Sequence, residues 1–184
     1  MAKLDKALET LWGLEYSNVY NILHKNKHEN GLTIYGIYQS AHPKWRGWEV
    51  VKEVLEKYKD IKQASKILSE NIVLKIWVED FYRENFWDVA KLDEVKSQHI
   101  AEEIFIFGVN VGMKTAVIKA QKLVGVIADG ICGNMTLKAI NSYNEDKFDI
   151  SFDKLEQKYY DAIIKAKPYL SINKKGWYNR SVSV

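Results

Sequence analysis

The first residue of the chain with a clear capacity for chemistry is Glu15. An apolar helical pattern precedes it, formed by Leu4, Ala7, Leu8, Leu11 and Trp12. The spacing of these residues places them and Glu15 on one face of a helix, so we predict that Glu15 points toward the core. Burial favours the protonated form of a carboxyl group, and a protonated Glu can serve as a general acid. The alternative is a helix-end carboxylate that turns outward to water.

The elements that must position Glu15 follow from hydrophobic periodicity and turn residues. We expect a first helix over 3–16, a loop over 17–31 and a short strand over 32–39 that is interrupted at Gly36. Further helices are predicted from Trp48, from Asp60 as an N-cap, and over 72–87, 98–111, 115–124, 135–143 and 151–167. Residues 98–111 form the buried central helix in this scheme, Ser151 caps the last helix and Pro168 ends it. The predicted fold class is mostly α (α+β), with a small β excursion near residues 31–39.

Length and composition narrow the class of protein. A chain of 184 residues with 47% hydrophobic content can bury the core of one globular unit. The net charge of +3 comes from interspersed basic and acidic residues without a basic tract. Such a charge favours attraction to an anionic polymer but does not specify nucleic acid, and we expect no nucleic-acid partner. Cys132 is the single cysteine, so no internal disulfide can form.

The chain shows no targeting signal. The N-terminal sequence lacks the uninterrupted apolar region of a secretory signal, and no run reaches the length of a membrane span. The sequence therefore predicts a protein that is made in the cytoplasm and is not an integral membrane protein.

Short blocks along nearly the whole chain carry a family resemblance. In chain order they are Glu15-Tyr16-Ser17-Asn18, Gly31 to Ile37, Phe81-Tyr82 with Phe86-Trp87-Asp88, Val109 to Gly112, Gln121 with Asp129-Gly130, Gly133 with Thr136-Leu137, and Gly176 to Arg180. Together they resemble the N-acetylmuramidases of glycoside hydrolase family 108, which are phage and prophage endolysins and their relatives.

The resemblance implies a lysozyme-like helical domain that hydrolyses the β-1,4 bond between N-acetylmuramic acid and N-acetylglucosamine in peptidoglycan. It implies a catalytic region over 1–112 and a helical, peptidoglycan-binding-like region over 113–184, packed into the same globular unit. The expected partners are glycan strands and a holin-type pore that releases this bacteriolytic enzyme to the cell wall. No cofactor and no metal are expected.

Glu15 resembles the catalytic Glu of the family's Glu-Gly-Gly-Tyr motif. This chain has Tyr16 and Ser17 where the family has glycines, which puts the turn geometry in doubt rather than the carboxylate. Glu29 stands near the position of an acidic residue in the family's loop, and it is a weaker candidate for a second carboxylate. Thr33 could orient water or hydrogen-bond a sugar. For both, the alternative is a loop residue that makes a turn bond.

Aromatic side chains and one amide complete the predicted substrate site. Aromatic rings stack on sugar faces, and the exposed-side candidates are Tyr35, Tyr38, Tyr82, Trp87 and Trp177. Asn110 ends an apolar helix; the resemblance suggests that it faces the cleft, and the alternative is a buried amide bonded to backbone.

The residues also allow other functions. His24 and His28 have the spacing of a helical metal pair, but their surroundings lack helical character and a zincin-type Glu, while His42 and His99 lack ligand-like neighbours. A lytic transglycosylase would use the same Glu without a water nucleophile. A non-catalytic peptidoglycan-binding protein would explain the missing glycines, and a structural adaptor would leave the placement of Glu15 unexplained.

Overall fold

The computed structural model describes residues 1–16, 18–26 and 30–184. Over these residues the chain is mostly helical with one small antiparallel sheet, which confirms the predicted lysozyme-like fold class. The chain divides into two compact units. Unit one comprises Met1–Leu11 and Arg83–Val184, and unit two comprises Trp12–Tyr82. Helix α1 (Leu4–Glu15) begins in unit one and ends in unit two.

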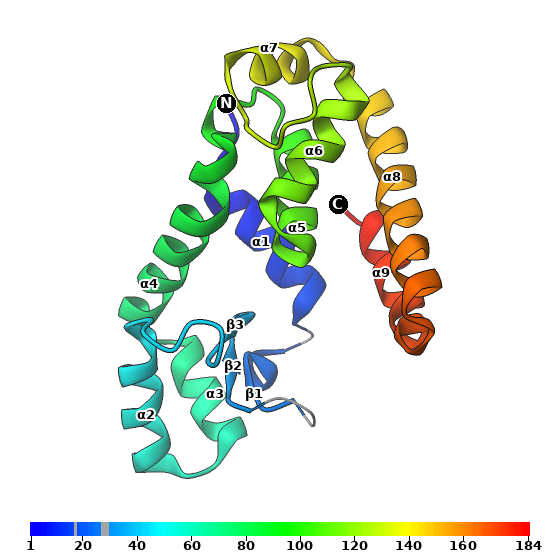
Figure 1. Ribbon diagram of the computed structural model, residues 1–184. Coiled ribbons are helices and arrows are strands. Elements are labelled where there is room, and N and C mark those ends of the chain that lie inside the picture. The colour runs from blue at the N-terminus through cyan, green and yellow to red at the C-terminus, as the bar shows by residue number, and fades with distance from the viewer. Residues whose placement is uncertain (17, 27–29) are drawn as a thin grey trace. The chain divides into compact units, whose positions relative to one another are not determined.

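Unit two contains the sheet and three helices. Its elements are η1 (Val19–Asn21), β1 (Leu23–His24), β2 (Thr33–Ile34), β3 (Ile37–Tyr38), α2 (Gly47–Tyr58), α3 (Ile61–Ser69) and α4 (Ile72–Tyr82). The strands are antiparallel in the order β1-β2-β3. Helix α3 packs against β1 and η1, and α2 packs against α3 and α4 (Figure 1).

The predicted strand over 32–39 is a hairpin. Tyr35 and Gly36 form its two-residue turn, and both have positive φ, 48° and 77°. A turn of this kind matches the twist of the two strands that it joins, and glycine adopts it at little cost. The predicted loop over 17–31 is wrong in part, because it contains η1 and β1. Strand β1 forms because Leu23 pairs with Ile34 and is buried, a contact that local sequence does not show.

The helix starts and ends in unit two follow local chemistry. Asp60 caps α3 as predicted, since its Oδ1 accepts a hydrogen bond of 2.7 Å from the Gln63 N–H. The helix predicted over 72–87 is an α-helix only as far as Tyr82. It continues in unit one as a π-helical turn, η2 (Arg83–Trp87).

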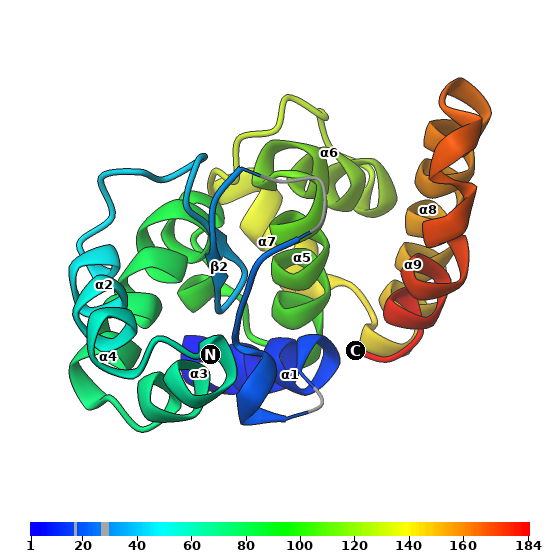
Figure 2. The same ribbon diagram turned by 90° about the horizontal axis from the view of Figure 1, so that it is seen from below.

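Unit one is built around α5. Besides the first part of α1 and η2, its elements are η3 (Asp88–Ala90), η4 (Leu92–Glu94), α5 (Gln98–Val111), α6 (Met113–Val124), α7 (Asn134–Ser142), α8 (Glu145–Ala166), η5 (Pro168–Asn173) and α9 (Lys174–Ser181). Helix α5 packs against α6 and α8, and α9 lies along α8 in both views (Figure 1, Figure 2). No helix among the described residues is long and apolar enough to cross a bilayer.

The core of unit one confirms the prediction of a buried helix over 98–111. Residues 100–108 of α5 are all buried. The Phe107 ring lies 5.7 Å from the Phe152 ring and 5.9 Å from the Tyr160 ring, so α8 covers this face of α5. The prediction that Ser151 caps the last helix is wrong. The N-cap is Asn144, seven residues before Ser151, and its side chain accepts a hydrogen bond from the Lys147 N–H.

Candidate active site

A cavity of about 380 Å³ lies in unit two, where α1 ends beside the sheet. It is lined by Glu15, Tyr16, Asn21, His24, Thr33 and Gly36. The lining therefore comes from the C-terminal end of α1, from η1, from the paired strands β1 and β2, and from the hairpin turn. Two of the predicted catalytic residues, Glu15 and Thr33, meet in this cavity.

Glu15 reaches the cavity from the last turn of α1. The prediction that it faces the core is wrong, because Glu15 is exposed. The fully buried stripe of α1 ends at Leu11, and the chain leaves the helix directly after Glu15, so its side chain extends past the packed surface. Glu15 nevertheless acts electrostatically on a buried neighbour, Tyr82. Burial is the larger cause of the raised pKa of Tyr82, and the negative charge of Glu15 is the second cause.

Tyr35 and Tyr82 form the wall behind the hairpin turn. The Tyr82 hydroxyl donates a hydrogen bond of 2.6 Å to the Tyr35 carbonyl, and both side chains are buried. The Tyr35 ring lies 5.4 Å from that of Trp12 and 6.1 Å from that of Tyr16, and burial raises the pKa of Tyr35 to about 12. The predicted exposure of Tyr35 and Tyr82 is therefore wrong. They hold the turn in place from inside.

Gly36 allows this wall to close. A Cβ atom at this position would lie 2.7 Å from the Tyr82 hydroxyl oxygen and 3.7 Å from that of Tyr16. Its φ of +77° is also unfavourable for a residue with a side chain. A glycine at this point lets backbone, rather than a side chain, form that part of the cavity lining.

Thr33 contributes a hydroxyl group to the cavity. It is 6% exposed, and its Oγ1 is a buried atom that has no hydrogen-bond partner in the part of the chain that the structure describes. Buried hydroxyl groups rarely remain without a partner in folded proteins. This hydroxyl therefore has hydrogen-bonding capacity left for a ligand or a water molecule in the cavity.

His24 is a cavity residue that sequence reasoning considered only as a metal ligand. Its Nδ1 lies 3.1 Å from the carbonyl oxygen of Asn21. A carbonyl oxygen can only accept, so Nδ1 must carry a proton, and in the neutral ring Nε2 is left as an acceptor. His24 lies opposite Thr33 in the β1–β2 pair, and only this pairing brings it to the site. His28 lies outside the described residues.

The other candidates in the first half of the chain lie elsewhere or cannot be placed. Glu29 lies outside the described residues. Tyr38, in β3 beside Thr33, is half-buried and donates a hydrogen bond of 3.3 Å to the carbonyl of Asn30.

The remaining candidates, Trp87, Asn110 and Trp177, belong to unit one. The predicted exposure of Trp87 is wrong, because the residue is fully buried in the core, where its Nε1 donates to Asp93. Asn110 is exposed and accepts a hydrogen bond from Arg180, so the alternative of a buried amide is also wrong.

Trp177 is half-buried, and its ring stacks on that of Tyr160 at 4.8 Å. One face of this indole is therefore already occupied.

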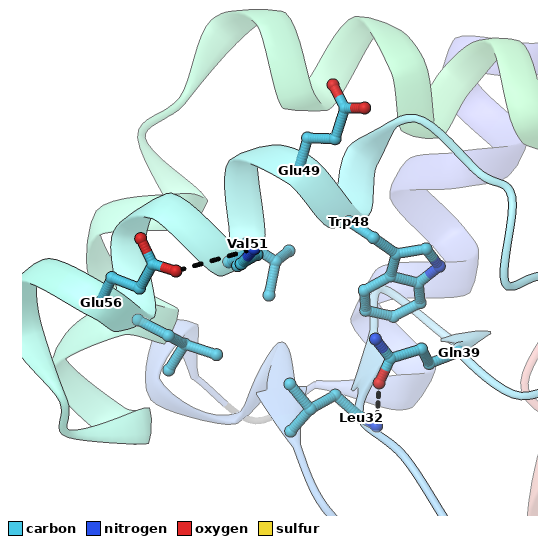
Figure 3. Close-up of a pocket in the computed structure, with 8 residues that line it drawn as sticks. Leu32, Gln39, Trp48, Glu49, Val51 and Glu56 are labelled. Carbon is cyan, nitrogen blue, oxygen red and sulfur yellow. Dashed lines mark hydrogen bonds and ion pairs between the residues drawn. The ribbon is translucent and has the colours of Figure 1, made fainter.

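A second cavity of unit two, of about 450 Å³, lies between the hairpin and α2 (Figure 3). Leu32, Trp48, Val51 and Leu55 give it an apolar lining, with Glu49, Lys52 and Glu56 among the remaining lining residues. Gln39 closes one side, and its Oε1 accepts a hydrogen bond of 3.1 Å from the Leu32 N–H. None of the predicted site residues lines this cavity.

Comparison with known proteins identifies the family. A family model described as Glycosyl hydrolase 108 matches residues 21–112, which is half of the chain. The chain belongs to the glycosyl hydrolase 108 family. The matched range of this family member includes His24 and Thr33 and begins after Glu15. The protein is thus a glycoside hydrolase by family.

One solved structure shows the same fold as this glycosyl hydrolase 108 member. The structure of SagA from Brucella abortus has a TM-score of 0.64 and 23% sequence identity, over 97% of this chain and 88% of that chain. A search of curated proteins found no match.

Proposed function

We propose that this glycoside hydrolase cleaves peptidoglycan at the β-1,4 bond between N-acetylmuramic acid and N-acetylglucosamine, with Glu15 as general acid. The observation that carries the proposal is the cavity of unit two. There a carboxyl group, the Thr33 hydroxyl and the His24 imidazole share one lining. Membership of a glycoside hydrolase family supports the reaction class.

The roles follow from what glycosidic hydrolysis requires. The departing oxygen needs a proton, and the developing oxocarbenium centre needs a nucleophile or a stabilising charge. In the proposal, Glu15 donates the proton. The Thr33 hydroxyl and the acceptor Nε2 of His24 orient the attacking water, and Glu29 remains the candidate for a second carboxylate.

The first test compares the wild type with Glu15→Gln on purified peptidoglycan, with mass spectrometry of the released fragments. The wild type should release fragments that end in reducing N-acetylmuramic acid. Glu15→Gln should lose roughly 10²- to 10⁴-fold in rate, the usual contribution of general acid catalysis. Because Glu15 is exposed, the variant should keep its fold, which circular dichroism checks. A variant that cuts as well as the wild type would remove Glu15 from its role.

A lytic transglycosylase is the second candidate function. Among the described residues that line the cavity, Glu15 is the one with a carboxylate, and a transglycosylase needs a single acid and no attacking water. Fragments with anhydro ends would support it. In that case His24→Gln and Thr33→Val should change the rate less than Glu15→Gln does. For the hydrolase, all three changes should slow cleavage.

The wider setting completes the proposal. We propose that residues 113–184 bind the wall and that the enzyme serves as a phage-type endolysin, made in the cytoplasm and released by a holin-type pore. Glu15→Gln should still co-sediment with sacculi, and its expression should lyse cells far less than the wild type when a pore protein is co-expressed. A wild type that binds sacculi and releases no fragments would instead be a non-catalytic binding protein.

A further inference from the structure

Helices α5 and α8 of unit one enclose a cluster of charged side chains that the proposed hydrolysis does not use. His99 and Glu103 lie one turn apart on α5, and Asp149 faces them from α8. The expectation that His99 lacks ligand-like neighbours is therefore wrong. Glu103 is four residues away on the same helical face, but Asp149 is 50 residues away and only the packing of α8 brings it near.

The distances within this trio are close to those between ligands that share one metal ion. His99 Nε2 lies 3.2 Å from Asp149 Oδ1 and 4.0 Å from Glu103 Oε1. One donor atom of each residue lies within 4.8 Å of the others. Ligands that share one ion at about 2.0–2.2 Å lie about 3–4 Å apart, so small side-chain adjustments would complete the site.

Glu103 gives an independent reason to expect a cation. The residue is 1% exposed, and neither of its carboxylate oxygens has a hydrogen-bond partner among the residues that the structure describes. A donor atom of Asp149, a second acidic residue, lies within 4.8 Å of a Glu103 carboxylate oxygen. A buried carboxyl group in such surroundings must hold a proton or pair with a cation.

We propose that His99, Glu103 and Asp149 bind a divalent first-row metal ion of the Zn²⁺ or Mn²⁺ kind, which ties α8 to α5. One imidazole with two carboxylates suits these ions, whereas Ca²⁺ and Mg²⁺ prefer oxygen ligands alone. Asp153 is the candidate fourth ligand. It lies one turn after Asp149 on α8, and its Oδ1 is a further buried atom without a described hydrogen-bond partner.

The site is open to an incoming ion. The side chains of His99 and Asp149 are 30% and 37% exposed, while Glu103 forms the buried end. The ion would have a structural role, because α8 also carries Phe152 and Tyr160, which cover α5. A ligand that binds only the folded state stabilises it in proportion to the logarithm of its concentration over Kd.

The test measures binding of ZnCl₂ and of MnCl₂ to the full chain after treatment with a chelator, by isothermal titration calorimetry. The wild type should bind one ion, with CaCl₂ clearly weaker. At about 100 times Kd the ion should raise Tm by roughly 5–10 °C. Loss of a residue that only hydrogen-bonds to a metal ligand typically weakens metal binding roughly 10- to 100-fold. Glu103→Gln and Asp149→Asn change the ligands themselves, so each should weaken binding by more than this.

Two controls keep the result specific. Asp146→Asn removes an exposed carboxylate from the first turn of the same helix and should bind the ion as the wild type does. The chain has four histidines, so NMR can identify which imidazole responds, and Zn²⁺ should shift the His99 signals. Absence of stoichiometric binding, unchanged affinity in Glu103→Gln, or a response confined to another histidine would overturn the proposal.

Discussion

Glu15 occupies the last turn of an amphipathic helix, where the direction of a side chain depends on where the helix ends and what packs against it. Leu11, one turn earlier on the same face, is buried, while Glu15 is exposed and lines the cavity. In this placement the carboxyl group is accessible from the cavity. The hairpin turn beside it packs on the buried side chains of Tyr35 and Tyr82.

Gly36→Ala tests the packing of this turn. The new methyl group would lie 2.7 Å from the Tyr82 hydroxyl oxygen, at a residue with positive φ. We expect the free energy of unfolding to fall by about 1–3 kcal/mol in urea denaturation, with a loss of activity.

The matched control for Gly36→Ala is Gly13→Ala. Gly13 lies in α1, is exposed and has no atom within 4 Å of an added Cβ, so alanine there should raise stability by about 0.5–1 kcal/mol. Combining Gly36→Ala with Tyr82→Phe removes the clashing oxygen. A double variant as unstable as the sum of the two single variants would argue against the clash.

Cys132 allows a second test on a single residue. The thiol is buried, and burial raises its pKa to about 11. Since the thiolate is the reactive form, the native protein should react with Ellman's reagent roughly 100-fold more slowly than the protein in concentrated urea, at mildly alkaline pH. Equal rates would mean that the thiol is accessible in the folded state.

At the scale of elements, one side chain organises the loop between α6 and α7. Gln121 on α6 is buried, and its Nε2 donates to Asp129 Oδ1 at 2.8 Å and to the Ile131 carbonyl at 3.0 Å. Its Oε1 accepts from the Gly130 N–H at 2.8 Å. The loop thus depends on an amide that offers both donors and an acceptor.

Gln121→Leu should therefore destabilise the protein by about 2–4 kcal/mol, since it keeps the side-chain volume and leaves several polar groups of the loop without partners. Urea denaturation measures the change. Lys122→Ala, at the next and exposed position of α6, should change stability by less than about 0.5 kcal/mol. Similar effects from both variants would mean that the loop does not need the amide.

At the scale of the whole molecule, unit one is assembled from segments far apart in the sequence. The first part of α1 joins residues 83–184 there, and the Ala2 N–H donates to the Val95 carbonyl at 2.8 Å. Helix α5, which belongs to the predicted catalytic region, buries Phe107 against Phe152 and Tyr160 of α8, which belongs to the predicted binding region.

A chain that ends at Gly112 should therefore fail to fold unit one. Removal of residues 113–184 leaves the apolar surface of α5 without its cover, and we expect loss of near-ultraviolet circular dichroism and binding of a hydrophobic dye. A chain that ends at Ser181 loses only residues after α9 and should keep both signals at the wild-type level. Cooperative unfolding of unit one in the chain that ends at Gly112 would show that this unit does not need residues 113–184.

Much of the architecture follows from the sequence itself. Periodicity predicts α1, α2, α5 and α6, and Asp60 predicts the start of α3, because each of these signals acts within a few residues along the chain. Gly36 predicts an interruption of the strand over 32–39, and the structure has a hairpin turn there. Glu15 and Thr33 are both site candidates from the sequence, and the structure places both in the lining of one cavity. Whether they act in catalysis stays a prediction.

Other features depended on contacts between distant segments, which local patterns do not encode. Strand β1, and with it His24, exists because β2 pairs with it, and the side-chain directions of Glu15, Tyr35 and Tyr82 depend on packing at the end of α1 and behind the hairpin. The cluster of His99, Glu103 and Asp149 arises only when α8 packs on α5. Local sequence thus predicts most of the helices, whereas packing between distant segments adds β1 and sets which polar groups meet and which become buried.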